Sequence, residues 1–230
     1  EEKWNDIKVI IEYGMLSEEK FYEKSNAFAL FPTTENKFFT YDELIKKIKK
    51  NHKDKDDKTV ILYSSNIQEQ DSYIKEANKK GYTVLLLDSP IASHLIQKLE
   101  TTKEKISFAR VDSDAIDNLI KKDEKSISKL SEKEQEKLKE QIEEVVAKDK
   151  YSVQLEAMDS ESLPFMITQP EFMRRMKDMQ NTGGTSMFGN MPEMYNLVVN
   201  TNNQLVNDIF KTKTKNKRDR LIKQSLDLAR

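Results

Sequence analysis

Apolar and polar positions in the first half of the chain alternate between strand-like runs and helical stripes. Residues 59–63 and 83–87 are short continuous apolar runs, which are typical of strands buried on both faces. Residues 68–80 and 90–99 instead carry apolar side chains at helical spacing, and residues 106–111 form a third strand-like run. This βαβαβ order predicts a small parallel sheet with helices on both of its faces.

Three further amphipathic helices are predicted ahead of this sheet, with Gly14 as the stop of the first one. Before the third helix, Thr40 and Glu43 have the spacing of a capping box. Together with these helices, residues 1–112 are expected to form one α/β domain of three layers. The helices cover, in order, residues 3–12, 20–30 and 41–50.

The stretch over residues 113–150 is dense in Lys and Glu, and it predicts a long charged helix that connects two domains. Ser131 and Glu134 again have the spacing of a capping box. A solvated charged linker is the alternative interpretation, but the cap and the periodicity favour a helix. The apolar positions after the cap form one narrow stripe: Leu138, Ile142, Val145 and Val146.

An α+β domain is predicted over residues 151–230. Residues 152–158 alternate polar and apolar side chains, which indicates a half-buried strand, and residues 163–167 are predicted to return as its hairpin partner. Residues 195–200 add a third strand. The helices expected after it cover residues 202–210 and a last amphipathic segment that includes residues 221–228.

A methionine-rich segment lies between these strands, since eight of the 9 methionines fall between Met158 and Met194. Thr168 and Glu171 have capping-box spacing, and Pro170 suits a first helical turn. Such a stripe most often faces a core, whereas a methionine surface can also repack against many partner shapes. The apolar stripe is Phe172, Met173, Met176 and Met179, and the charged residues opposite are Arg174, Arg175, Lys177 and Asp178.

Composition excludes several classes of protein. Charged residues make up 34% of the chain and nearly balance, with a formal net charge of −1, so general attraction to nucleic acid or acidic membranes is not predicted. The chain has no cysteine, which excludes disulfides and is typical of the reducing cytoplasm. No apolar run approaches the roughly 20 residues that span a bilayer. Trp4 lies in an amphipathic pattern near the first residue, as expected for a piece of a longer protein.

The sequence contains no recognisable catalytic or metal-binding constellation. His52 and His94 lack ligand spacing, and both are expected to be ordinary surface or helix residues. The glycine-rich residues 182–189 lack the Lys-Ser/Thr ending of a phosphate loop. Asp88 and Ser89 follow a predicted strand, where capping of the next helix is the expected role.

The basic segment over residues 211–220 supports an alternative function, a nucleic-acid-binding module. Basic runs of this kind more often lie on the solvated surface of a helix. An enzyme built on the α/β domain is a further alternative, which the missing glycine-rich phosphate loops disfavour.

Four segments in order carry a resemblance to a known family: residues 3–8 (KWNDIK), 39–44 (FTYDEL), 59–63 (TVILY) and 81–91 (GYTVLLLDSPI). Together they resemble the ninety-kilodalton heat-shock chaperones. The similarity runs from Trp4 to Val111 and resumes from Val153 to Arg230, so it covers most of the chain.

The resemblance implies a place for both predicted domains. Residues 1–112 would be the small α/β/α subdomain of the middle domain, and residues 151–230 most of the carboxy-terminal homodimerisation domain. Family members continue past the position of Arg230 with a second interface helix. ATP and magnesium would be bound by an amino-terminal domain outside this chain, so the chain itself is expected to be no enzyme and to hold no cofactor. The implied dimer-interface residues are Leu221, Ile222, Leu226 and Leu228.

In the family, an amphipathic helix of the carboxy-terminal domain is implicated in holding client proteins. The resemblance therefore favours an exposed client-binding role for the methionine stripe over a core role. The expected partners are unfolded or partly folded client proteins and, in the full-length protein, a second protomer. A membrane is not expected, and nucleic acid is the disfavoured alternative. The implied client-binding residues are Phe172, Met173, Met176, Met179, Met187 and Phe188.

Overall fold

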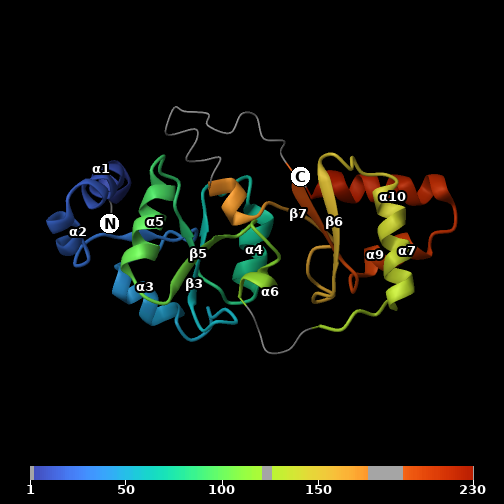
Figure 1. Ribbon diagram of the computed structural model, residues 1–230, viewed down its shortest axis with the longest axis horizontal. Helices are drawn as coiled ribbons and strands as arrows, with labels where there is room; N and C mark the ends of the chain where they lie inside the picture. The colour runs from blue at the N-terminus through green and yellow to red at the C-terminus, as the bar shows by residue number, and fades with distance from the viewer. Residues whose placement is uncertain (1–2, 121–125, 176–193, 230) are drawn as a thin grey trace. The chain divides into compact units, whose positions relative to one another are not determined.

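The structure is a computed structural model that describes residues 3–120, 126–175 and 194–229. The described residues divide into two compact units, each with its own sheet and hydrophobic core. Figure 1 shows the elements of both units. The first unit contains the described parts of Glu1–Lys121 and Glu171–Met187, and the second contains those of Lys122–Pro170 and Phe188–Arg230.

A three-stranded parallel sheet forms the centre of the first unit. Its strands are β3 (Thr59–Ser64), β4 (Val84–Leu86) and β5 (Ile106–Arg110), in the order β4-β3-β5. All six residues of β3 are buried, which explains why this central strand is a continuous apolar run. Strands are thus present at the three positions where the sequence predicts them in this unit.

Helices cover both faces of this sheet (Figure 1). Successive side chains of β3 point to opposite faces, so Ile61 and Tyr63 pack in one core while Val60 and Leu62 pack in another. A short antiparallel pair, β1 (Phe31–Pro32) with β2 (Phe38–Phe39), lies at the first face. The helices of the first face are α1 (Trp4–Ser17), α2 (Glu19–Ser25), α3 (Tyr41–Ile48) and α5 (Ala92–Thr102), and those of the second are α4 (Asp71–Lys79) and α6 (Ile116–Leu119).

The predicted helix stop at Gly14 is wrong, because α1 continues to Ser17. A Cβ atom at Gly14 would lie 2.8 Å from the ring of Phe21 in α2. The glycine therefore allows two consecutive helices to approach closely and does not end the first one.

The second unit contains a mixed sheet whose strand order differs from the prediction. β8 pairs in parallel with β6 and antiparallel with β7, so the predicted hairpin between residues 152–158 and 163–167 is wrong. Leu197, Val198 and Val199 of β8 are 0% exposed, and the strand with this continuous apolar run takes the central place. The strands are β6 (Tyr151–Glu156), β7 (Phe165–Thr168) and β8 (Tyr195–Asn200), in the order β6-β8-β7.

A side chain, in place of strand pairing, stabilises the connection from β6 to β7. Asn200 Oδ1 accepts the backbone N–H of Met158 at 3.2 Å, and Asn200 Nδ2 donates to the carbonyl oxygen of Asp159 at 2.7 Å. These bonds satisfy backbone groups that a hairpin ladder would otherwise satisfy.

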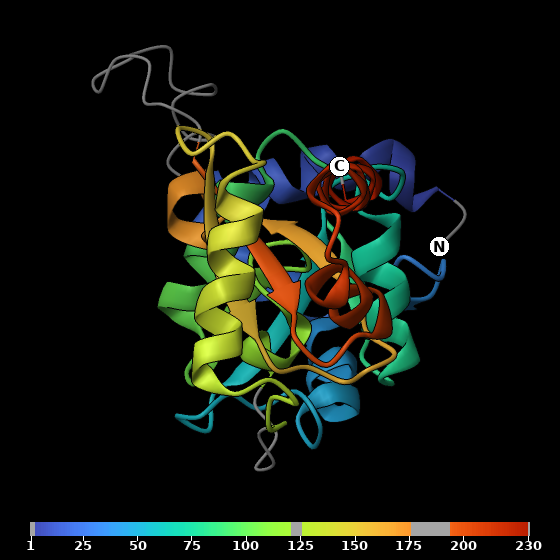
Figure 2. The same ribbon diagram turned by 90° about the vertical axis from the view of Figure 1, so that its right-hand side faces the viewer.

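Three helices lie on one face of this sheet (Figures 1 and 2). The first begins at the capping box of Ser131, as predicted, but it has only 12 residues, so the single long helix predicted over residues 113–150 is wrong. Its Leu138 and Ile142 are 0% exposed and belong to the core of the second unit. The helices are α7 (Glu132–Glu143), α9 (Gln204–Lys211) and α10 (Lys215–Leu228).

Polar residues singled out from the sequence have definite places in the first unit. His52 is 0% exposed, so the expectation of an ordinary surface residue is wrong for it, whereas His94 lies half-buried on α5. Ser89 Oγ accepts a backbone N–H at the start of α5 at 3.2 Å, and Asp88 pairs with Lys8 at 2.5 Å.

Across the described residues, no helix has the length and apolar character needed to cross a membrane.

Candidate functional site

Residues 171–175, within the methionine-rich segment, form an amphipathic turn whose polar side faces the protein. Residues 171–175 are helical and belong to the first unit; they lie in the short orange helix of Figure 1. Phe172 is 71% exposed and Met173 is 36% exposed, whereas Arg174 is only 3% exposed. This is the reverse of the usual arrangement, in which apolar side chains face the protein and charged ones face water.

The carboxylate of Glu171 is the centre of the buried polar contacts. Its Oε1 accepts hydrogen bonds from Tyr63 Oη at 2.7 Å, Arg174 Nη2 at 2.6 Å and Arg175 Nε at 2.7 Å. Its Oε2 accepts the backbone N–H of Arg110 at 3.1 Å. Arg174 also donates to Tyr63 Oη, and its guanidinium lies 5.5 Å from the centroid of that ring. One acidic group thus joins this turn to β3 and β5.

Arg175 extends these contacts to α5. Its Nη1 donates to Glu100 Oε2 at 2.6 Å, and its Nη2 donates to Glu100 Oε1 at 3.2 Å and to the carbonyl oxygen of Phe108 at 2.8 Å. Glu100 Oε1 in turn accepts the backbone N–H of Phe108 at 2.6 Å. Bidentate contacts between a guanidinium and a carboxylate fix the relative orientation of the two side chains as well as strengthening their attraction.

The pKa values in this cluster follow from burial and from neighbouring charges. Burial by itself raises the pKa of Glu171, but Arg174 and Arg175 outweigh it, and the pKa of this carboxyl lies below its ordinary 4.5. Burial, together with the Glu171 carboxylate, raises the pKa of the Tyr63 hydroxyl well above its ordinary 10. Burial lowers the pKa of Arg175, but its bonds to Glu100 and Glu171 outweigh it and raise the pKa. Glu171 and Arg175 therefore stay charged at neutral pH.

The predicted capping box of Thr168 and Glu171 is not formed. The Oγ1 atom of Thr168 is buried without a hydrogen-bond partner among the described residues, and the Glu171 carboxylate is bound by Tyr63, Arg174 and Arg175 instead. The two arginines that follow Glu171, together with the distant Tyr63, bind the carboxylate in place of a local cap, because charge-assisted hydrogen bonds are the stronger ones.

The structure describes two of the six predicted client-binding residues. Phe172 and Met173 are both exposed and adjacent. The other four, Met176, Met179, Met187 and Phe188, lie outside the described residues.

The four predicted dimer-interface residues lie in α10 but differ in exposure. Ile222 is 0% exposed, Leu226 is 7% exposed, and Leu221 packs against the same core of the second unit. Leu228 is 87% exposed at the end of the helix. Packing within the chain thus occupies the first three residues, whereas the side chain of Leu228 is exposed.

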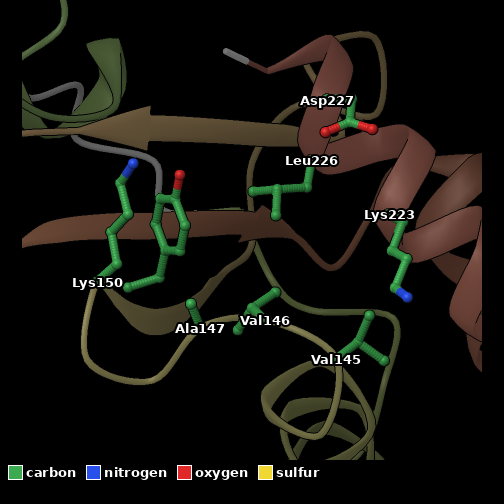
Figure 3. Close-up of a pocket in the computed structure, with 8 residues that line it drawn as sticks. Val145, Val146, Ala147, Lys150, Lys223, Leu226 and Asp227 are labelled. Atoms are coloured by element: carbon green, nitrogen blue, oxygen red, sulfur yellow. The ribbon is translucent and has the colours of Figure 1, made fainter.

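A pocket of about 290 Å³ lies in the second unit, lined by the turn after α7, the start of β6 and the end of α10 (Figure 3). Figure 3 shows Lys150, Lys223 and Asp227 on different sides of it, so these charges do not converge on one point where a reacting atom would sit. Its remaining lining is apolar: Val145, Val146, Ala147, Tyr151 and Leu226.

A second exposed apolar surface, on α1, was not anticipated from the sequence. Ile7, Ile10 and Tyr13 follow one another at helical spacing and are 43%, 71% and 65% exposed. The amphipathic pattern of residues 3–12 identifies the helix, but it does not reveal that this side is left uncovered.

Within the described ranges, no group of three or more acidic or histidine side chains is placed to hold a metal ion. The glycine-rich residues 182–189 lie outside the described part of the chain. The described residues of this site therefore form a surface, on which an exposed apolar pair lies beside partly buried ion pairs.

Comparison with known proteins assigns the chain to a family. The family model described as Hsp90 protein matches residues 1–229. This chain belongs to the Hsp90 family. The resemblance inferred from the four segments is thereby confirmed.

Several curated members of this family are similar to the chain over most of its length. The chaperone protein HtpG of Bacteroides thetaiotaomicron is 46% identical over 214 residues. That of Bacteroides fragilis is 44% identical over 215 residues, and that of Porphyromonas gingivalis is 41% identical over 214 residues. Each match covers 91% of this chain and 31% of the relative, so the chain spans about a third of the length of these Hsp90 proteins.

Proposed function

We propose that this chain is a client-holding module of a molecular chaperone and that Phe172 and Met173 belong to its client-binding surface. Two facts support the proposal. The similar Hsp90 proteins are named as chaperones, and the turn that carries Phe172 and Met173 presents its apolar side to water. We further propose that the ATPase of such a chaperone lies outside this chain.

The observation that carries the proposal is the reversed polarity of residues 171–175. Burial of a Phe or Met side chain stabilises a fold by about 1.5–3 kcal/mol, and this turn forgoes most of that gain at Phe172 while it buries Arg174. A methionine beside an exposed aromatic ring can adapt to many partner shapes. An adaptable apolar surface suits partners that share exposed apolar segments and no fixed shape.

The direct test is the double variant Phe172→Ser with Met173→Ser. Because both side chains are exposed, its free energy of unfolding should stay within about 0.5 kcal/mol of the parent chain. Its affinity for carboxymethylated α-lactalbumin, a permanently unfolded protein, should fall about tenfold or more when the contacts of two apolar anchors are lost. Fluorescence anisotropy would measure the affinity, and urea denaturation the stability.

The matched control is Ile10→Ser, since Ile10 is also 71% exposed and lies in the same unit. It should leave client affinity nearly unchanged. If the double variant loses several kcal/mol of stability, the pair is interior and the proposed role is wrong. If Ile10→Ser weakens binding equally, binding reflects non-specific hydrophobic contacts and not a surface formed by Phe172 and Met173.

A nucleic-acid-binding module remains the alternative, since Lys213 is exposed just before the basic helix α10 and Lys217 and Arg220 are exposed in its first half. An acidic partner reduces the positive charge of this helix, since Lys215 is paired to Glu144 at 3.0 Å. Tight filter binding of RNA or DNA that weakens steeply with salt would favour this alternative over the chaperone proposal.

A further inference from the structure

The outer edge of β5 is covered by side chains. Among the described residues, β5 pairs with β3 on one side only. On its other side, the N–H of Phe108 donates to Glu100, its carbonyl oxygen accepts from Arg175, and the N–H of Arg110 donates to Glu171. Edge strands leave such groups unpaired unless something covers them. Here the cover is supplied by α5 and by the turn of residues 171–175.

These contacts anchor the turn to backbone atoms of a sheet, which are rigid compared with the tips of surface side chains. Glu171 and Arg175 each make one bond to the backbone of β5 and others to side chains of the first unit. The anchor therefore limits rotation of the turn about its own axis as well as its position.

The charges of the anchor balance in the observed orientation. Two carboxylates, Glu100 and Glu171, meet two guanidiniums, Arg174 and Arg175, at distances of 2.6–2.7 Å. A rotation that buried Phe172 would take Arg175 away from Glu100. It would also take both Glu171 and Arg175 away from the edge of β5. Partly buried charges left without partners are costly, so the ion pairs disfavour the orientation that apolar burial alone would select.

We propose that Glu100 is a positioning residue for the client surface, which it acts on through Arg175 by holding residues 171–175 with Phe172 and Met173 outward. This inference rests on the function proposed above. Both carboxylate oxygens of Glu100 are used, one by Arg175 alone and the other by Arg175 and the N–H of Phe108. Removal of this one charge should therefore loosen the contact between α5 and residues 171–175.

The test compares Glu100→Gln with Glu104→Gln. Gln keeps an oxygen that can accept the N–H of Phe108 but removes the negative charge that holds Arg175. Glu104 is exposed, and its replacement makes the same change of net charge in the loop just after α5. Two readouts are needed: amide hydrogen exchange of residues 172–175, and the affinity for carboxymethylated α-lactalbumin.

For Glu100→Gln we expect exchange about tenfold faster and client affinity about tenfold weaker, because a charge-assisted bond contributes roughly this factor. The thermal midpoint of the first unit should change little, and Glu104→Gln should behave as the parent chain. Arg175→Gln also removes the bonds to Glu171 and to the carbonyl oxygen of Phe108, so it should give both effects at least as strongly. Adding Glu100→Gln to it should change little further, because the bond between the two residues is already lost.

Unchanged exchange in Glu100→Gln would overturn the positioning role and leave the proposed function standing. Faster exchange with unchanged client affinity would show that the anchor exists but that clients bind elsewhere, which overturns the proposed function and this inference with it. A fall in the thermal midpoint that accounts for the whole change in exchange would also overturn the inference, since Glu100 would then have only a structural role.

Discussion

His52 is buried against the parallel sheet of the first unit, where both of its ring nitrogens are bonded. Nδ1 lies 2.9 Å from the carbonyl oxygen of Val60, and Nε2 accepts the backbone N–H of Thr83 at 3.1 Å. This pair of bonds requires a neutral ring with its proton on Nδ1. Burial lowers the pKa of His52 from 6.5 to about 4. The residue thus joins β3 to the segment that leads into β4.

The depressed pKa of His52 predicts loss of stability in acid. The folded-state pKa lies below that of the unfolded chain, so the contribution is fully present above pH 6.5 and is lost as the pH falls through about 4. The free energy of unfolding should fall by up to about 3 kcal/mol. Urea denaturation from pH 7 to pH 4 would measure it.

The control for this prediction is His52→Gln, which does not titrate. It should be less stable than the parent chain at pH 7, and the gap between the two should narrow towards pH 4. An NMR titration that finds the His52 ring protonated near its ordinary pKa of 6.5 would contradict the prediction.

At the scale of elements, two helices begin with reciprocal side-chain caps. Thr40 with Glu43 caps α3, and Ser131 with Glu134 caps α7. In both, the carboxylate accepts from the backbone N–H and from the hydroxyl of the first residue, at 2.7–2.9 Å. The bonds lower the pKa of both carboxyls. The turn of residues 171–175 lacks this local cap and depends on distant partners.

Removal of either cap should have a modest and local cost. Thr40→Ala and Ser131→Ala should each lower the free energy of unfolding by about 1 kcal/mol, because orphan N–H groups at the helix start lose an acceptor. Ser72→Ala, at an exposed position inside α4, is the control and should change stability by less than about 0.5 kcal/mol. Equal effects in all three variants, measured by urea denaturation, would contradict the capping explanation.

At the scale of the whole molecule, the two units offer different surfaces. The first presents the apolar pair of residues 172 and 173, and the second presents Leu228 at the end of α10. We propose that the chain forms a homodimer and that Leu228 lies in its interface. Ile222 and Leu226 pack inside the second unit, so the end of α10 is the part of the predicted dimer interface that another protomer could contact.

Sedimentation velocity over a range of concentrations tests the dimer. The parent chain should shift from monomer to dimer as its concentration rises, and Leu228→Ser should need about tenfold higher concentration, as expected from the loss of one buried leucine. Ile127→Ser, at a position 88% exposed in the same unit, is the control and should sediment as the parent chain. A parent chain that stays monomeric throughout would rule the proposal out.

Local patterns were enough to locate most elements. The strands near residues 59–63 and 106–111 could be predicted because a continuous apolar run needs burial on both faces. The caps at Thr40 and Ser131 could be predicted because their bonding partner lies three residues away. Family membership could be inferred for a similar reason, since ordered segments of sequence carry it.

The tertiary structure alone decided which surfaces these elements present. The sequence places Phe172 and Arg174 on opposite sides of a helix but does not say which side faces the protein. That choice depends on Tyr63, which is 108 residues from Glu171, and on Glu100, which is 75 residues from Arg175. β8 likewise takes the place between β6 and β7 because its long-range burial outweighs local pairing. Periodicity determines an element, whereas contacts between distant residues determine its orientation and neighbours.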